Sequence, residues 1–343
     1  MKKHSHIRRT LIGGALALVL TSLSSMSAFA AEPIVIKFSH VVADDTPKGK
    51  GATKFKELAE RYTKGAVEVE VYANSTLYKD KEEMEALQLG AVQMLAPSLS
   101  KFGPLGVREF ELFDLPYIFD GNDALRKITE GPVGADLLSR LEPKGVKGLA
   151  FWDNGFKVLS ANSPIKAPAD LKGKKMRIQS SKVLEEQFRE VRALPQVMAF
   201  SEVYQALQTG VVDGTENTVS NYYTQKVHEV QKHMTLSDHG YIGYALITNK
   251  KFWDGLPAEV RTQLDRAVKD STAYANQIAK EENDKSLEAV RASGKTEIHT
   301  PTAEEKAALK KAFIPVHKKM ESRIGAELIQ SIYKETGFDP AKL

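Results

Sequence analysis

A short string of residues occurs twice in this chain, at matching places in the predicted order of strands and helices. Residues 86–92 read Ala-Leu-Gln-Leu-Gly-Ala-Val, and residues 206–212, at a spacing of 120 residues, read Ala-Leu-Gln-Thr-Gly-Val-Val. In each copy a predicted helix ends on glycine and a strand begins at once, which is a common arrangement by itself. Because the strings occupy the same place in two larger units, we interpret them as an internal duplication.

Both larger units predict the order strand, helix, strand, helix, strand. In the first unit the predicted strands are 34–39, 67–72 and 91–95, and the helices are 47–63 and 80–89. In the second the predicted strands are 175–179, 196–199 and 211–215, and the helices are 182–191 and 201–208. This order is typical of an open parallel sheet in an α/β fold. Such sheets bind ligands beyond the carboxyl ends of their strands, so two of them would enclose a cleft.

A third region predicts one long helix between Pro257 and Gly294, residues that suit a first helical turn and a helix end. Apolar residues recur there at near-helical spacing, at Val260, Leu264, Val268, Ala275, Ile278, Leu287 and Val290. At about 1.5 Å per residue the helix would exceed about 50 Å and bridge both lobes. Two shorter helices are the alternative.

Residues 1–30 are predicted to be a signal peptide. Four basic residues precede the apolar stretch Leu11–Leu20, which is too short to span a bilayer, and Ala28-Phe-Ala30 fits a signal-peptidase site. We therefore expect cleavage after Ala30 and a periplasmic protein. The 313 residues that remain are enough for two domains.

Charge and cysteine content narrow the functional classes. The chain has 48 Lys and Arg and 44 Asp and Glu, and four of the basic residues lie in the predicted signal. The remainder is neutral and has no overall field for nucleic acid or an anionic membrane, so an anion site must be a local cluster. The absence of cysteine excludes disulfides, thiolate metal sites and cysteine nucleophiles.

Several strings together resemble one family. They are Phe38-Ser-His-Val-Val42, Glu83–Leu95, Lys174-Lys-Met-Arg-Ile178, Ala199-Phe-Ser-Glu-Val-Tyr204 and Asp213-Gly-Thr-Glu-Asn217. Over essentially all of the chain after residue 30 they resemble the periplasmic receptors of tripartite ATP-independent (TRAP) transporters, the DctP family. The resemblance implies an α/β, two-lobed periplasmic binding protein fold, with open mixed or parallel sheets and a long helix bridging both lobes.

The resemblance also implies a function. Such receptors close around a ligand and deliver it to membrane permease subunits without chemistry on it. The strings at 40–49 and 152–157 are most similar to the branch that binds C4-dicarboxylates (malate, succinate, fumarate). We expect lobe I to comprise 31–154 plus 243–285 and lobe II 155–242 plus 286–343. We expect a monomer without cofactor, metal or nucleic acid.

Three other interpretations remain open from the sequence. In the first, the protein is a receptor of the same kind for another small organic acid, such as a monocarboxylic keto or hydroxy acid. In the second, the protein is a periplasmic sensory receptor. In the third it is a periplasmic enzyme, although the sequence contains no recognisable nucleophile–base pair or set of metal ligands.

Arg177 is the first candidate for the site, because it lies near the end of a predicted strand with its side chain opposite to those of its apolar neighbours. A guanidinium binds a carboxylate through two parallel hydrogen bonds, and the resemblance assigns this residue that role. Asn217 follows the last strand of the second unit, and an amide both donates and accepts. By resemblance Asn217 contacts the ligand and Phe200 packs against it.

The remaining candidates would bind the far end of the ligand or line the cleft. Lys157 and Asn154 follow the predicted first crossing between lobes, and a lysine there would pair with a second carboxylate. From lobe I we add His40, Lys48 and Ser98, and from the strand returning to lobe I we add Tyr241 and Tyr244. Each of these is also compatible with an ordinary loop or core residue.

Overall fold

The computed structural model describes residues 32–340, so the predicted signal peptide and its cleavage site lie outside the described residues. Within that range no helix is both long enough and apolar enough to cross a membrane. The strands and helices that the first repeat predicts are present. They are β1 (Ile34–Ser39), α1 (Pro47–Tyr62), β2 (Val67–Tyr72), α2 (Glu83–Gln88) and β3 (Met94–Leu95).

The second repeat has its own matching set. It consists of β5 (Lys175–Ile178), α5 (Lys182–Glu190), β6 (Leu194–Val197), the 3-10 turn η5 (Phe200–Glu202), α6 (Val203–Gln208) and β7 (Gly214–Thr218). In both repeats the first strand lies between the other two and pairs with each in parallel. Phe38 pairs with Met94, and Met176 pairs with Gly214, which is 120 residues after Met94. The same topology and spacing are what a duplication would produce.

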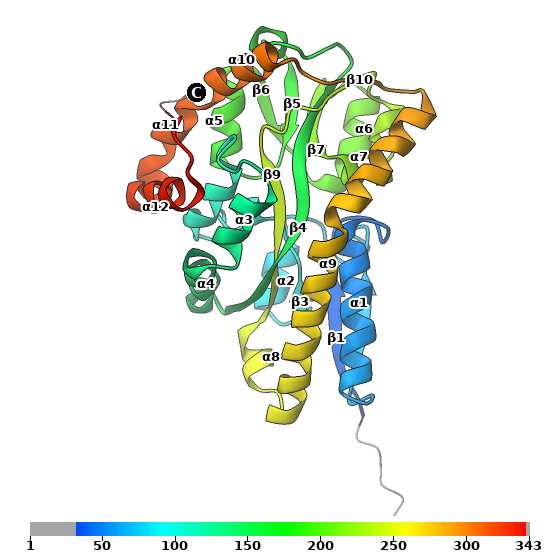
Figure 1. Ribbon diagram of the computed structural model, residues 1–343. Helices are drawn as coiled ribbons and strands as arrows, with labels where there is room; N and C mark the ends of the chain where they lie inside the picture. The colour runs from blue at the N-terminus through cyan, green and yellow to red at the C-terminus, as the bar shows by residue number, and fades with distance from the viewer. Residues whose placement is uncertain (1–31, 341–343) are drawn as a thin grey trace, which may run out of the picture. The chain divides into compact units, whose positions relative to one another are not determined.

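Two long strands join the repeats into one sheet. β9 (Tyr241–Asn249) pairs antiparallel with β3 and with β4 (Val146–Ala161), and the far end of β4 pairs antiparallel with β7. The order of strands is β2-β1-β3-β9-β4-β7-β5-β6, and off this path β8 (His233–Thr235) pairs with β4 and β10 (Glu297–His299) pairs with β8. Figure 1 shows β4 and β9 side by side through the middle of the molecule. We call the part with β1–β3 the first half and the part with β5–β7 the second half.

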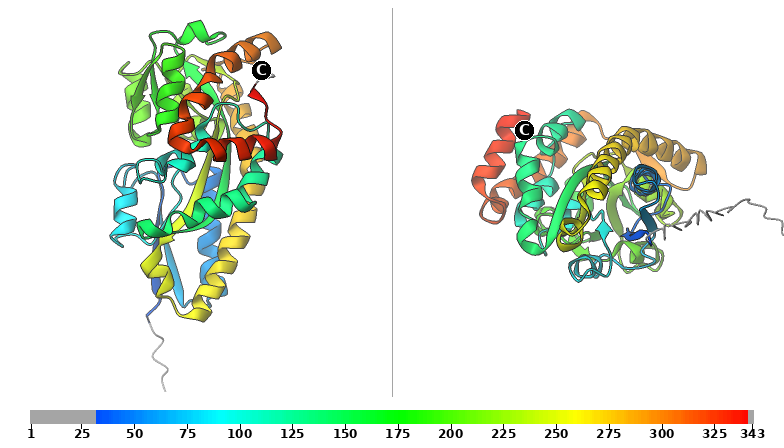
Figure 2. Two further views of the ribbon diagram at one scale, coloured as in Figure 1. Left: turned by 90° about the vertical axis from the view of Figure 1, so that its left-hand side faces the viewer. Right: turned by 90° about the horizontal axis from the view of Figure 1, so that it is seen from below.

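The long helix is confirmed as a single element, α9 (Ala258–Ser293). Pro257 precedes it, and Gly294 ends it in the left-handed conformation, with φ 64°. Its buried residues Leu264 and Ala275 pack in the same core as β1 and α1, whereas Val290 packs in the core around α6 and α7 (Val219–Thr224). Figures 1 and 2 show α9 beside α1 and then continuing toward α7, so it bridges both halves.

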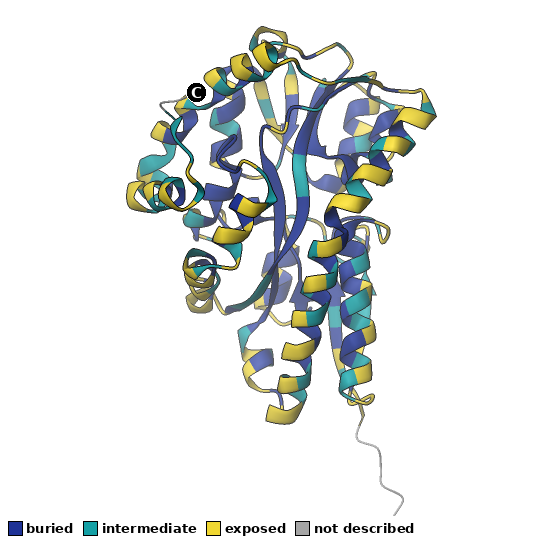
Figure 3. Cartoon of the chain, viewed as in Figure 1, coloured by how far each residue is buried: buried dark blue, intermediate teal, exposed yellow. Residues whose placement is uncertain are grey.

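The remaining helices cover the outside of the sheet. They are α3 (Asn122–Thr129), α4 (Pro132–Ser139), α8 (Lys250–Asp254), α10 (Ala303–Phe313), α11 (Pro315–Ile324) and α12 (Ala326–Thr336), with 3-10 turns η1 (Leu99–Lys101), η2 (Arg108–Asp114), η3 (Glu142–Lys144), η4 (Pro168–Leu171) and η6 (Val227–Glu229). α10 packs on the second half through Leu309 and Phe313. α12 instead packs against α3, in a core that includes residues of β3 and β9. α12 therefore contacts the half of the molecule that contains β3. Figure 3 shows the central strands buried and the outer helix faces exposed.

Candidate ligand-binding site

A small cavity lies between the two halves of the sheet, and we call it the inner cavity. Its volume is about 20 Å³, which is close to the space that one water molecule requires. Both halves contribute lining residues, together with β9. They are Val41, Val42, Lys48, Asp80, Ser98, Lys101, Arg177, Gln179, Phe200, Asn217, Asn221, Ile242 and Tyr244.

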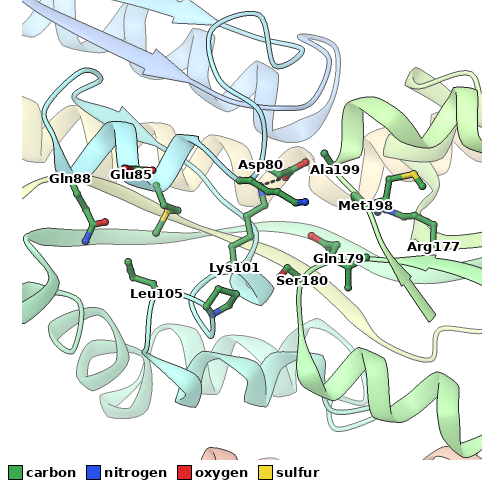
Figure 4. Close-up of a pocket in the computed structure, with 14 residues that line it drawn as sticks. Asp80, Glu85, Gln88, Lys101, Leu105, Arg177, Gln179, Ser180, Met198 and Ala199 are labelled. Carbon is green, nitrogen blue, oxygen red and sulfur yellow. Dashed lines mark hydrogen bonds and ion pairs between the residues drawn. The ribbon is translucent and has the colours of Figure 1, made fainter. Parts of the chain in front are cut away.

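A larger space adjoins it, and we call this the outer cavity. Its volume is about 290 Å³, and it shares Asp80, Lys101, Arg177 and Gln179 with the inner cavity. Figure 4 shows Arg177, Met198 and Ala199 grouped to one side of Asp80 and Lys101. Apolar side chains form much of its remaining lining, among them Met84, Leu105, Val197 and Met198. The outer cavity therefore continues the inner one away from β9.

Arg177 is held in place at the end of β5. Its Nε and Nη2 atoms donate to the carbonyl oxygen of Met198 at 3.1 and 2.8 Å, and its Cζ lies 5.8 Å from the ring centroid of Phe200. Its Nη1 atom has no hydrogen-bond partner among residues 32–340. Burial lowers the pKa of the guanidinium, which nevertheless stays charged. The backbone thus fixes one edge of the fork and leaves the other for an anion.

Amide side chains form a second group beside the inner cavity. Asn217 Oδ1 accepts from the backbone N–H of Thr218 at 2.9 Å and from Asn221 Nδ2 at 3.0 Å. Tyr244 Oη accepts from Asn154 Nδ2 at 2.7 Å, so Asn154 supports the wall without lining the cavity. The Oδ1 atom of Asn221 is buried and has no partner in the part of the chain that the structure describes. These amides offer a ligand both donors and acceptors.

Lys48 supplies an unusual buried charge on the first-half wall. It is 1% exposed, its Nζ donates to the Ala96 carbonyl oxygen at 2.9 Å, and the same atom lies 3.9 Å from the Tyr244 ring centroid. No described carboxylate lies within ion-pair distance. Burial, together with the nearby Lys101 ammonium, lowers the pKa of Lys48 to about 7. A buried ammonium without a counter-charge favours an anionic ligand next to it.

Lys101, by contrast, is paired with two acids. Its Nζ contacts Asp80 and lies 2.6 Å from Glu83 Oε1. Burial alone would raise the pKa of Asp80, but the Lys101 charge lowers it to about 2. Burial raises the pKa of Glu83. Burial also disfavours the charged form of Lys101, but the two neighbouring acids hold the pKa of Lys101 above its ordinary value. This acid–lysine cluster therefore offers less free positive charge than Lys48.

Sequence reasoning missed four polar residues that line the inner cavity: Asp80, Lys101, Gln179 and Asn221. One signal was available, because Lys101 and Asn221 stand 120 residues apart, at equivalent positions of the two repeats. Gln179 and the predicted Ser98 come from opposite halves, and Ser98 Oγ donates to the Gln179 side-chain oxygen. Of the predicted residues, the structure brings together Arg177, Asn217, Phe200, Lys48, Ser98 and Tyr244 around the inner cavity.

Lys157 does not line the inner or the outer cavity, so the structure does not bring it together with the predicted residues named above. Its Nζ lies 2.8 Å from Glu216 Oε1 and 4.0 Å from Asp114 Oδ1, and all three side chains are buried. His239 Nε2 is 2.8 Å from the other oxygen of Glu216. The charge of Lys157 is therefore compensated within the protein, where β4 pairs with β7.

His40 and Tyr241 likewise lie outside both cavities. His40 is fully buried with its ring 6.3 Å from that of Phe38, and its ring nitrogens have no partner among the described residues. Burial and the Lys48 charge lower its pKa to about 3, so the ring is neutral. Tyr241 donates to Asp153 Oδ1 at 2.8 Å and packs in the first-half core. Neither side chain is placed to contact a ligand in the inner cavity.

The described residues contain no group of three or more His, Asp and Glu side chains that is arranged to hold a metal ion. The inner cavity is lined by cationic, amide and aromatic side chains on facing walls, together with the carboxylate of Asp80. Such a set binds and orients an organic anion.

Comparisons with known proteins find relatives along nearly the whole chain. The C4-dicarboxylate-binding periplasmic protein DctP of Rhodobacter capsulatus is 64% identical over 330 residues, which cover 96% of this chain and 99% of the relative. The C4-dicarboxylate-binding protein DctB of Bacillus subtilis is 42% identical over 302 residues, which cover 88% of this chain and 86% of the relative.

Two solved structures are similar along the whole fold. A TRAP periplasmic solute binding protein from Shewanella oneidensis with bound succinate is 41% identical, with a TM-score of 0.87, and covers 89% of this chain and 99% of its own. One from Pseudomonas aeruginosa with bound L-malate is 46% identical, with a TM-score of 0.82, and covers 84% of this chain and 100% of its own. The family described as bacterial extracellular solute-binding protein, family 7, matches residues 38–323. The chain therefore belongs to this family, the DctP family.

Proposed function

We propose that this protein is the extracytoplasmic receptor of a TRAP transporter and that it binds a C4-dicarboxylate such as malate, succinate or fumarate in the inner cavity. The observation that carries the proposal is the pair of cations on opposite walls. Arg177 comes from the second half with a free edge of its guanidinium, and Lys48 comes from the first half without a carboxylate partner. Two carboxylates joined by a short carbon chain complement such a pair.

The amides and the aromatic ring would then distinguish a suitable ligand. Asn217 and Asn221 would bind a carboxylate or a hydroxyl, and Phe200 would cover the carbon chain. Ser98 and Tyr244 would complete the first-half wall. Lys101 would add a long-range positive charge that its own acids partly cancel.

Entry of the ligand would require the halves to separate, and the walls of the inner cavity would shift to make room for a four-carbon diacid, because the cavity here has space for about one water molecule. We propose lobe I as 31–154 plus 243–285 and lobe II as 155–242 plus 286–343, with α12 resting on lobe I. β4, β9 and α9 cross between the lobes and would form the hinge. The closed form would be the one that the permease subunits recognise.

The remaining assignments follow from the family. We propose that cleavage after Ala30 releases a periplasmic monomer that works with membrane permease subunits and performs no reaction on its ligand. The relatives named above for C4-dicarboxylates favour this interpretation over a receptor for monocarboxylic acids.

Calorimetry with succinate, L-malate, fumarate and butyrate tests the proposal. We expect a 1:1 complex with the diacids, recovery of each acid unchanged, and much weaker binding of butyrate, which has the same carbon chain and one carboxylate. A diacid at 100 times its dissociation constant should stabilise the fold by about 2.7 kcal/mol. Equal affinity for butyrate and succinate would point to a monocarboxylate receptor, and turnover of any acid would point to an enzyme.

A second measurement addresses closure. Small-angle scattering should give a smaller radius of gyration with saturating succinate than without it. The same radius in both conditions would contradict hinge closure.

A further inference from the structure

The carboxylate of Asp80 contacts both halves of the protein. One oxygen contacts the ammonium of Lys101, on η1 of the first half, and the other accepts from the backbone N–H of Phe200 at 2.5 Å, on η5 of the second half. Figure 4 shows Asp80 next to Lys101 and near the segment that carries Met198 and Ala199. Both partners line the inner cavity, so Asp80 joins its two walls directly.

We infer that Asp80 is a positioning residue, a tether that forms when the cleft closes and holds Phe200 and Lys101 at their places around the ligand. This role rests on the proposed closing motion and adds a residue that the sequence did not single out. Asp80 need not touch the ligand to act, because it fixes the two residues that flank it.

The chemistry of the contact supports a strong tether. A carboxylate that accepts a backbone N–H while paired with an ammonium forms charge-assisted hydrogen bonds, which are roughly twice as strong as neutral ones. Lys101 and the Phe200 amide both favour the ionised form of Asp80, against the effect of its burial. Asp80 is only 14% exposed in its side chain, so water competes little for its oxygens.

A neighbouring contact between the halves provides the matched control. Lys79 Nζ lies 3.5 Å from Glu202 Oε1, and both side chains are about half exposed, at 53% and 51%. Exposed pairs of this kind contribute little to stability. Lys79 and Asp80 are adjacent in sequence, so Lys79→Ala tests the same segment without removing the buried contact.

The repeat explains why these groups face each other. Asp80 and Phe200 are 120 residues apart and precede the equivalent helices α2 and α6. Duplication therefore places the same chain position on both sides of the cleft, with a carboxylate on one side and a free backbone donor on the other.

The first test measures amide hydrogen exchange of Phe200 by NMR in wild type and Asp80→Ala. Both proteins are saturated with an acid that wild type binds, because the tether forms only in the closed cleft. The measurement does not depend on which acid that is, so it remains decisive if the proposed ligand class is wrong. We expect the Phe200 amide to exchange at least about tenfold faster in the variant. The Gly49 amide, which donates to Thr46 Oγ1 at 3.1 Å within the first half, should be unaffected. An unprotected Phe200 amide in ligand-saturated wild type would overturn the tether.

The second test measures succinate and butyrate affinities in wild type, Asp80→Ala, Asp80→Asn and Lys79→Ala. A tether stabilises the closed form for every ligand, so Asp80→Ala should weaken both acids by a similar factor, about tenfold or more, through faster dissociation. Lys79→Ala should change neither by more than about twofold.

The variants also separate the tether from two other roles of Asp80. If Asp80 acts only as a negative charge beside the cavity, Asp80→Asn would tighten succinate more than butyrate and leave Phe200 exchange unchanged. If it only stabilises the first half, the melting temperature of the ligand-free protein would fall and dissociation rates would not change. Either result would overturn the inference. Failure of wild type to bind succinate would instead contradict the proposed function.

Discussion

The two halves of this protein share a backbone plan but differ in the charged groups that they bring to the cavity. In both, the first strand lies between the second and third, and Met94 and Gly214 occupy equivalent register positions. Yet position 101 is a lysine paired with two acids, whereas its equivalent at 221 is an asparagine. The second half contributes its cation from β5 instead, as Arg177. A duplicated scaffold has therefore acquired complementary walls rather than identical ones.

A second contrast concerns two buried lysines. Lys48, on α1 at the cavity, has no carboxylate within ion-pair distance among the described residues, whereas Lys157, on β4 at the junction of the halves, pairs with Glu216 and lies near Asp114. Both are essentially unexposed. The same residue type thus indicates a ligand in one region and internal compensation in the other, and the same substitution at both positions should separate the two roles.

The largest effect is expected at the junction. Lys157→Gln leaves Glu216 buried with His239 as its remaining partner, so the free energy of unfolding should fall by about 3–5 kcal/mol. Denaturant unfolding measures this loss of stability. Lys285→Gln, which removes an exposed ion pair, is the control and should lower the free energy of unfolding by no more than about 1 kcal/mol. If the variant is stable and its affinity falls for succinate but not for butyrate, Lys157 contacts the ligand.

Arg177→Ala should have the next largest effect, this time on binding. A desolvated carboxylate loses its paired charge, so succinate affinity should fall by about 2–5 kcal/mol. Arg177→Lys should also weaken binding strongly. The guanidinium donates two hydrogen bonds to the Met198 carbonyl oxygen and keeps a second planar edge for the carboxylate, and an ammonium cannot do both. Calorimetry on the three proteins measures this. Near-native affinity in the lysine variant would show that the geometry of the fork is not used.

Lys48→Gln tests the first-half wall with the substitution used at Lys157. We expect succinate to lose about 2 kcal/mol of affinity and butyrate very little, because only the diacid presents a second carboxylate. The free energy of unfolding should stay the same or rise, since an unpaired buried charge is removed. Lys50→Gln, two residues along α1 and paired with Glu282, is the matched control. Equal losses for both acids would remove Lys48 from the role of second cation.

Most of the fold could be predicted from the sequence because its signals are local. Val67–Tyr72 alternates apolar and charged residues and is a strand with those bounds, and Pro257 and Gly294 flank α9 as their conformational preferences require. The bounds of β4 are harder to predict from the sequence, which indicates only that the chain crosses between the lobes near Trp152. A strand that passes from one half to the other has no single buried face, so its 16 residues show no regular alternation.

The site divides in the same way. Arg177 and Asn217 were predicted from the family resemblance together with their places near strand ends, whereas Asp80 precedes α2 and Lys101 ends η1, in segments whose course depends on tertiary packing. Lys157 lies apart from these residues for a related reason: the sequence shows a lysine after the crossing but not that Glu216, on the neighbouring strand β7, pairs with it. A buried charge can be compensated by the protein or by a ligand, and only the three-dimensional contacts distinguish the two.

The smallest expected effect, and the most specific to Lys48, is on the pH dependence of binding. In the closed cleft burial and Lys101 lower the pKa of Lys48 to about 7, and Glu83 and Asp80 only partly oppose this. A dianion beside it raises that pKa, so binding takes up a proton, and affinity is full below pH 7 and declines as the pH rises through this value. From pH 7 to 8 succinate affinity should fall about fivefold, or about 1 kcal/mol. Calorimetry in buffers of different ionisation enthalpy measures the proton directly, and Lys48→Gln should abolish both effects. If the affinity of wild type does not change with pH, Lys48 is already charged in the open cleft. Its lowered pKa would then arise only when the two halves close together, and not from the first half by itself.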